Sequence, residues 1–190
     1  MKALGVPGEA EYEGRGVSQC ADCDGPMFQN EEVVVVGGGD SALQEALVLA
    51  RYCGKVHLLH RGERFRARPH FVERVTASPK ISMIWNSTLE EISGGKMVEK
   101  VRIRGTRDGQ ARDLACAGVF VCVGLEPNAE CLPPDVRRDE RGFVVTGDGL
   151  ETSVPGIWAI GAVRSGYSGL LRHAAAEAKR AAAIVAERLR

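Results

Sequence analysis

The sequence has no long apolar run and no excess of charge of either sign. No stretch approaches the roughly 18 apolar residues that a membrane-spanning helix needs, and the first residues lack the basic-then-apolar pattern of a secretion signal. Lys and Arg together number 25, as do Asp and Glu, so the overall charge gives no sign of a polyanionic partner. We therefore expect a cytoplasmic protein that binds neither a membrane nor a nucleic acid.

The cysteines lack the regular spacing of a secreted disulfide framework. Six occur, but only Cys20 and Cys23 lie close together in the sequence. A C-x-x-C pair is typical of a redox disulfide, and it is also half of a tetrahedral zinc site. No second C-x-x-C and no histidine pair at the usual zinc spacing occurs, and two ordinary buried cysteines are a third interpretation. Asp24 follows directly, and its carboxyl group is suited to protonating a newly formed thiolate.

Residues 1–124 have the pattern of an α/β domain, in which apolar strands alternate with amphipathic helices before a hairpin. The predicted strands are residues 33–36, 56–59, 81–85, 89–92, 98–104 and 118–123, and the predicted helices are residues 41–52 and 69–78. The turn at 93–96 joins the two strands of the hairpin. The expected fold class is therefore α/β, a Rossmann-like dinucleotide-binding domain whose parallel sheet carries helices and a β-meander.

Residues 125–190 differ in character, with several prolines and turns at their start. Two short strands are predicted at 143–145 and 157–160, and an alanine-rich helix at about 169–189. Two short strands are too few to bury a core, so we expect this part to be an incomplete second domain.

A glycine turn follows the four consecutive valines at 33–36 and opens the first long helix. Its sequence, Gly37-Gly38-Gly39-Asp40-Ser41-Ala42, matches the dinucleotide fingerprint G-x-G-x-x-A. In this fingerprint the first glycine permits a tight turn, the second lets the backbone approach a diphosphate, and the small third residue allows close packing of helix on strand. The diphosphate is expected at the N-terminus of the helix, where free N–H groups attract anions.

The second predicted strand ends in a basic segment rather than in the acidic residue that binds the ribose of NAD. Residues 51–74 carry seven basic and two acidic side chains, a local net charge of about +5. His60-Arg61 and the nearby Arg66 suit a 2′-phosphate, which favours NADPH over NADH. Glu63 keeps NADH as an alternative, and a nucleic-acid patch is a weaker one because the segment has few aromatic residues.

These motifs follow one another in the order found in the low-molecular-weight thioredoxin reductases, which the chain resembles over nearly its whole length. The resemblance rests on Leu4-Gly5-Val6-Pro7-Gly8-Glu9, Gly14-Arg15-Gly16-Val17-Ser18, Cys20 to Gly25, Val35 to Ala42, His60-Arg61, Gly124 to Asn128 and Thr152 to Ile157. It implies that NADPH reduces FAD, that the flavin reduces the C-x-x-C pair, and that the dithiol reduces thioredoxin or a similar small dithiol protein. It also implies a possible homodimer.

The resemblance assigns roles by position. Cys20 and Cys23 match the redox pair and Asp24 the general acid. The glycine turn matches the diphosphate site, and Arg61 and Arg66 match arginines that hold the 2′-phosphate. The expected cofactor-binding residues are Gly37, Gly38, Gly39, Asp40, Ser41, Ala42, His60, Arg61, Arg66, Gly124 and Gly161.

The sequence also departs from the family pattern. Gly62 stands where a second arginine is usual, Ile160-Gly161-Ala162 replaces an A-G-D whose aspartate binds the flavin, and the R-Q-A expected near 167–173 is absent. The strand–turn–helix that binds the FAD diphosphate is missing as well. We therefore expect residues 1–124 to be an NADP(H)-binding domain with the redox pair, and residues 125–190 to be the C-terminal half of an FAD-binding domain. A binding module without redox activity is the alternative function.

Overall fold

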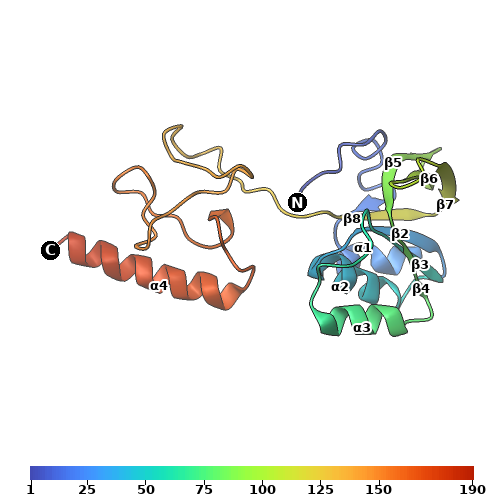
Figure 1. The fold of residues 1–190 in the computed structure, drawn as a ribbon, viewed down its shortest axis with the longest axis horizontal. Helices are drawn as coiled ribbons and strands as arrows, with labels where there is room; N and C mark the ends of the chain where they lie inside the picture. The colour runs from blue at the N-terminus through green and yellow to red at the C-terminus, as the bar shows by residue number, and fades with distance from the viewer. The chain divides into compact units, whose positions relative to one another are not determined.

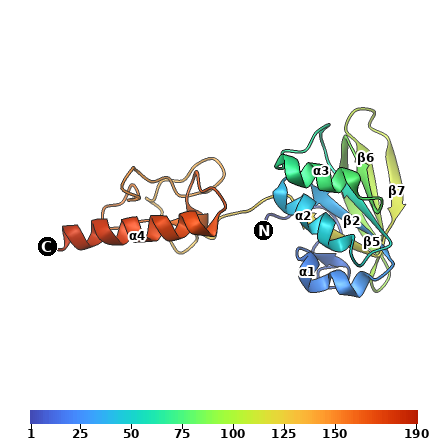
Figure 2. The same ribbon diagram turned by 90° about the horizontal axis from the view of Figure 1, so that it is seen from below.

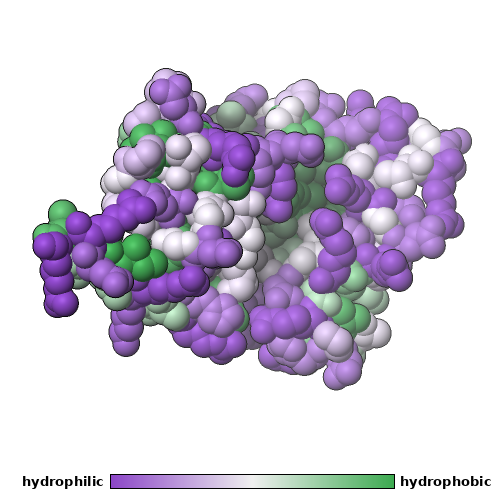
Figure 3. Space-filling view, turned by 60° about the vertical axis from the view of Figure 1, so that its left-hand side comes forward, coloured by the Kyte–Doolittle hydropathy of each residue, from purple (hydrophilic) through white to green (hydrophobic).

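A computed structural model describes all residues from 1 to 190, and it divides the chain into two compact units, Met1–Gly124 and Leu125–Arg190. Figures 1 and 2 show the helices and strands of both units. No helix in either unit has the length and apolar character needed to cross a membrane. Hydrophilic side chains dominate the face drawn in Figure 3, with hydrophobic ones gathered in a few smaller areas.

A five-stranded parallel sheet forms the centre of the first unit. Its order is β1-β8-β2-β3-β4, with β1 at Val17–Ser18, β8 at Gly118–Cys122, β2 at Glu32–Gly37, β3 at Lys55–Leu59 and β4 at Ile81–Ile84. Strand β2 is buried on both faces because Val33 and Val35 pack into one hydrophobic cluster and Val34 and Val36 into another. This explains why the strand reads as an unbroken run of valines rather than as an alternating pattern.

Helices cover one face of this sheet and a small antiparallel sheet covers the other (Figures 1 and 2). On the helical side lie α1 (Ala21–Asp24), the 3₁₀ helix η1 (Gly25–Phe28), α2 (Asp40–Leu49) and α3 (Pro69–Ala77). The antiparallel sheet has the order β5-β6-β7, with β5 at Ser87–Gly94, β6 at Val98–Gly105 and β7 at Ala111–Ala115. The three layers confirm the predicted α/β class.

The second unit contains little regular structure. Its elements are the 3₁₀ helix η2 (Gly161–Val163) and the helix α4 (Leu171–Arg188), and a small core of Ala129, Val136, Val144 and Ala159 holds its loops together. The helix predicted at about 169–189 is therefore confirmed.

The two short strands predicted in the second unit are wrong. Val144 makes only isolated bridges with Arg138 and Arg164, and Trp158 makes one with Glu151. The carboxylate of Asp139 accepts hydrogen bonds from the N–H groups of Arg141 and Phe143, both at 2.9 Å. A side chain thus satisfies backbone donors that a strand would need for its ladder, and the segment forms a turn instead.

Candidate functional site

The redox pair lies at the start of α1 and forms a disulfide. Cys20 and Cys23 are bonded with a Cα–Cα distance of 5.3 Å. Cys20 is the N-cap of the helix, and its sulfur accepts the N–H of Cys23 at 3.2 Å. Cys20 is half-buried and Cys23 exposed, so solvent reaches the bond. Because each sulfur is bonded to the other, this state of the pair is that of a redox disulfide rather than of a zinc ligand pair.

Asp24 and Ser18 lie beside the disulfide and are joined by a hydrogen bond. The hydroxyl of Ser18, on β1, donates to Oδ2 of Asp24 at 2.5 Å and accepts the N–H of Cys20 at 3.1 Å. Ser18 therefore links the proposed general acid to the backbone of the redox pair. Its site role was missed in the sequence, where the only available signal is a hydroxyl two residues before the first cysteine.

Glu45 on α2 also reaches the redox helix. Its Oε2 accepts the N–H of Ala21 at 2.5 Å, which satisfies one of the free donors at the start of α1. This contact fixes α1 against α2. No local pattern could reveal it, because the two residues are 24 positions apart in the sequence.

Each glycine of the turn between β2 and α2 has a different surrounding. A Cβ on Gly37 would lie 2.4 Å from the carbonyl oxygen of Cys122 and 2.6 Å from the Cβ of Ala42. A Cβ on Gly38 would lie 2.3 Å from Nδ1 of His60, whereas one on Gly39 would meet nothing within 4 Å. Two of the glycines are thus required by packing, and Gly39 alone leaves its backbone open to an approaching group.

The basic segment after β3 is docked on this turn. The N–H of Arg66 donates to the carbonyl of Gly38 at 2.8 Å. His60 packs against Gly38 and lies among Phe65 and Trp85, at ring-centroid distances of 5.6 and 6.0 Å. Burial in this cluster lowers the pKa of His60 below its ordinary value, so the ring is neutral at physiological pH.

A cavity of about 510 Å³ opens beside the glycine turn, within the first unit. Nine of the predicted cofactor-binding residues line it: Gly37, Gly38, Gly39, Asp40, Ser41, His60, Arg61, Arg66 and Gly124. Ala42 does not, because it is fully buried beneath the turn, and Gly161 belongs to the second unit. The cavity is bordered by the glycine turn, by the N-terminus of α2 and by two arginines, and these groups fit a phosphorylated dinucleotide.

Glu63, which kept NADH as an alternative, does not line the cavity. Its carboxylate forms an ion pair with Arg107 instead. Lys2, Ser87 and Thr88 do line the cavity and were missed by sequence reasoning, because segments distant in sequence supply them.

In the turn around Gly161, the backbone N–H of Gly161 is already hydrogen-bonded within the second unit. Gly161 has a φ of +67° and donates its N–H to Oε2 of Glu177 at 2.7 Å, while Arg164 pairs with the other oxygen of that carboxylate. Ala162 is exposed and has no polar atom in its side chain. The turn therefore presents no free side-chain ligand.

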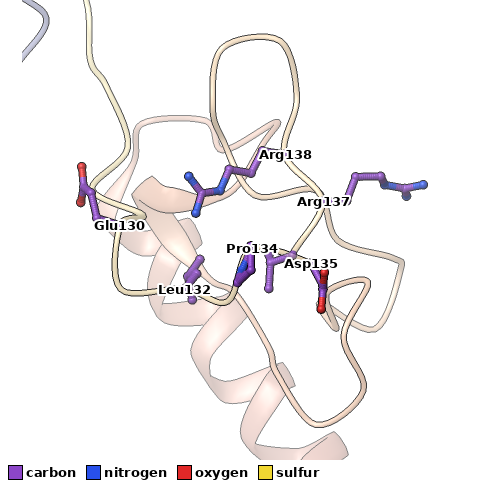
Figure 4. A pocket seen from close by; sticks show the side chains of 7 residues that line it. Glu130, Leu132, Pro134, Asp135, Arg137 and Arg138 are labelled. Carbon is purple, nitrogen blue, oxygen red and sulfur yellow. The ribbon is translucent and has the colours of Figure 1, made fainter.

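A second, shallower hollow of about 840 Å³ lies in the loops of the second unit (Figure 4). Its lining is Glu130, Leu132, Pro134, Asp135, Val136, Arg137 and Arg138. Arg138 donates from Nη2 to the carbonyl of Ala129 at 2.7 Å, and the guanidinium of Arg137 points away from the hollow in Figure 4. None of the predicted site residues lines it.

Comparison with known proteins identifies the family. The model for "Pyridine nucleotide-disulphide oxidoreductase" proteins matches residues 1–178. The chain belongs to this family. The matched region includes both the disulfide and the glycine-lined cavity.

Individual relatives of this chain are thioredoxin reductases. Those of Treponema pallidum and Listeria innocua are each 45% identical, over 86% of this chain and 53% and 52% of their own lengths. The structure of the Lactococcus lactis enzyme matches 98% of this chain and 62% of its own with a TM-score of 0.95 and 38% identity. The chain spans about half the length of the curated relatives it matches, and it looks like part of a thioredoxin reductase.

Proposed function

We propose that this chain supplies the nucleotide site and the redox disulfide of an NADPH-dependent thioredoxin reductase. The observation that carries the proposal is that one compact unit, Met1–Gly124, contains both the Cys20–Cys23 disulfide and the glycine-lined cavity with Arg61 and Arg66. Neither feature alone defines the reaction, because a nucleotide cavity serves many dehydrogenases and a C-x-x-C pair serves many exchange proteins.

Arg61 and Arg66 would bind the 2′-phosphate, and the turn from Gly37 to Ser41 would hold the diphosphate. The pairing of Glu63 with Arg107 supports NADPH, because it engages the acidic residue that lies next to Arg61 and Arg66 in the sequence. His60 is a positioning residue, since its neutral ring packs against Gly38 and fixes the turn.

Reduction of the disulfide needs two electrons and two protons and yields two thiols. NADPH would supply a hydride, which is two electrons and one proton, and turning that hydride into dithiol chemistry is what a bound flavin contributes in this family. Asp24 would supply the second proton to a departing thiolate, and Ser18 would hold its carboxyl group beside the pair. One cysteine would then attack a thioredoxin disulfide to form a mixed disulfide, and the other would displace the reduced partner.

The residues of the second unit fit a flavin poorly. The Gly161 N–H is used by Glu177, and Ala162 offers no hydrogen bond. The same observation favours a second candidate function, an NADP(H)-binding module without redox turnover.

Turnover separates the two candidates. The chain, with any flanking sequence that its gene encodes, is purified, supplied with FAD and NADPH, and mixed with oxidised thioredoxin. We expect NADPH oxidation coupled to thioredoxin reduction, abolished by Cys20→Ser and by Cys23→Ser but retained by Cys131→Ser, a matched control at the exposed cysteine of the second unit. Nucleotide binding without turnover, and without flavin absorbance, would establish the binding module instead.

The family resemblance also suggests a partner protein and an oligomeric state. The partner would be thioredoxin or a similar small dithiol protein, and the assembly would be a homodimer, which sedimentation measures directly. Three buried free thiols, Cys53, Cys116 and Cys122, are compatible with a reducing compartment such as the cytoplasm.

A further inference from the structure

Lys2 reaches the nucleotide cavity beside the end of β8, whereas Arg61 reaches it beside the end of β3. Lys2 lines the cavity, and its N–H donates to the carbonyl of Gly124 at 2.9 Å, just beyond the end of β8. Arg61 lies just beyond the end of β3. Strands β8 and β3 flank β2 on its two sides, so their ends are about 10 Å apart.

The segment that carries Lys2 is held in place at several points. The carboxylate of Glu9 accepts the N–H groups of Leu4 and Gly5 at 2.9 and 2.7 Å. Further along, the carbonyl of Pro7 accepts the N–H of Ile92, on β5, at 3.0 Å. Lys2 is thus presented to the cavity by an ordered backbone, although its long side chain is exposed.

The charges around Lys2 leave it available to a ligand. Lys2 takes part in none of the ion pairs of the structure. Asp40, an acidic residue that lines the cavity, is paired with Arg68. The ammonium group of Lys2 adds positive charge to a cavity edge beside a helix N-terminus, which strengthens the attraction of that edge for an anion.

The geometry assigns a nucleotide-binding role to Lys2. We propose that it contacts the phosphate on the nicotinamide side of the diphosphate, while Arg61 and Arg66 contact the 2′-phosphate on the adenosine side. This rests on the proposed function, because it assumes that the cavity takes a pyridine dinucleotide. It predicts a division of labour: the arginines select NADPH over NADH, whereas Lys2 strengthens the binding of both.

Calorimetry on the full chain with three ligands tests this division. The ligands are NADP⁺, NAD⁺ and 2′,5′-ADP, which has the 2′-phosphate but lacks the nicotinamide-side phosphate. Lys2→Met keeps the aliphatic stem and removes the charge, so we expect it to weaken NADP⁺ and NAD⁺ by the same factor, about tenfold, and to leave 2′,5′-ADP within about twofold. Lys2→Arg should bind all three as the unaltered chain does.

Arg61→Met is the matched contrast. It should weaken NADP⁺ and 2′,5′-ADP and leave NAD⁺ nearly unchanged, since only the first two ligands carry a 2′-phosphate. Unfolding curves that superimpose for the unaltered chain and Lys2→Met show that the fold is intact. If Lys2→Met binds both dinucleotides normally, or weakens 2′,5′-ADP as much as NADP⁺, the role of Lys2 is wrong while the proposed function stands. If the unaltered chain binds none of the three ligands, both fail.

Discussion

The carboxylate of Asp40 accepts two hydrogen bonds from Arg68, one from the backbone N–H at 2.7 Å and one from Nε at 2.6 Å. Asp40 is the first residue of α2, and Arg68 directly precedes α3. Together with the bond from Arg66 to Gly38, this contact fastens the basic segment to the glycine turn. The two parts of the proposed phosphate site are therefore fixed relative to each other before any nucleotide binds, which reduces the entropy lost on binding.

Replacing Asp40 by Asn should loosen this attachment. The amide oxygen can still accept the Arg68 N–H, but the charge opposite the guanidinium is lost. Both side chains are more than one-third exposed, so we expect the free energy of unfolding to fall by only about 0.5 to 1 kcal/mol. NADP⁺ affinity should fall about twofold to fivefold, because the segment must then be ordered on binding. Urea unfolding and calorimetry measure the two effects, and unchanged affinity would argue against preorganisation.

The same pair makes a prediction about pH. Hydrogen bonds from the Arg68 backbone and side chain hold the pKa of Asp40 below its ordinary value. A depressed pKa means that the carboxylate stabilises the fold above the unfolded-state pKa, about 4, and that this contribution disappears as the pH falls through the folded-state pKa. The stability difference between the unaltered chain and Asp40→Asn should therefore shrink in acid. A difference that stays constant from neutral pH into the acid range would contradict the pairing.

Gly38→Ala and Gly39→Ala should fail in different ways. The new Cβ at position 38 would overlap the His60 ring, which Phe65 and Trp85 confine, so we expect a loss of about 1 to 3 kcal/mol in stability. The new Cβ at position 39 meets open space, so the stability loss should stay below about 1 kcal/mol, the scale of a changed N-cap. That methyl group would nevertheless occupy the approach to the turn and weaken NADP⁺ binding. Equal stability losses in the two variants would refute this reading of the turn.

The four cysteines outside the disulfide should differ sharply in reactivity. Burial raises the pKa of Cys53 to about 11 and those of Cys116 and Cys122 to about 12, so few of these thiols are ionised near neutral pH. Cys131 is exposed. Brief iodoacetamide treatment of the oxidised chain should therefore modify Cys131 alone, and treatment after mild reduction should add Cys20 and Cys23. Peptide mass spectrometry identifies the sites, and rapid labelling of Cys122 would show that the cavity wall opens.

Glu63 should have no influence on the choice of cofactor. Its partner is Arg107, and it does not line the cavity. We expect Glu63→Gln to leave the ratio of NADPH to NADH affinity unchanged, whereas Arg66→Gln should lower it by about tenfold through loss of a charged hydrogen bond. Competition binding with both nucleotides measures the ratio. A larger preference for NADPH in Glu63→Gln would mean that the carboxylate repels the 2′-phosphate after all.

Local patterns in the sequence predicted most of the first unit. Four consecutive valines predicted a buried strand, and glycines followed by a helical apolar pattern predicted the turn between β2 and α2. Two strands were not predicted: β1 has only two residues, and β7 reads Ala-Arg-Asp-Leu-Ala with little apolar signal. Both gain their order from neighbours, since β1 pairs with β8 and β7 with β6.

The sequence by itself determined which residue types the site has, namely two cysteines at exchange spacing, a glycine fingerprint and a basic segment after the second strand. Those features depend on residues close together in the chain, where spacing controls chemistry. Only the tertiary structure decided that Ser18 holds Asp24, that His60 makes Gly38 indispensable, that Glu63 is diverted to Arg107, and that Lys2 faces the cavity. Each of these contacts depends on how side chains and backbone segments are arranged by the packed sheet, and Glu63 and Lys2 are matched with partners from distant segments. A linear pattern of residues carries no signal for such an arrangement.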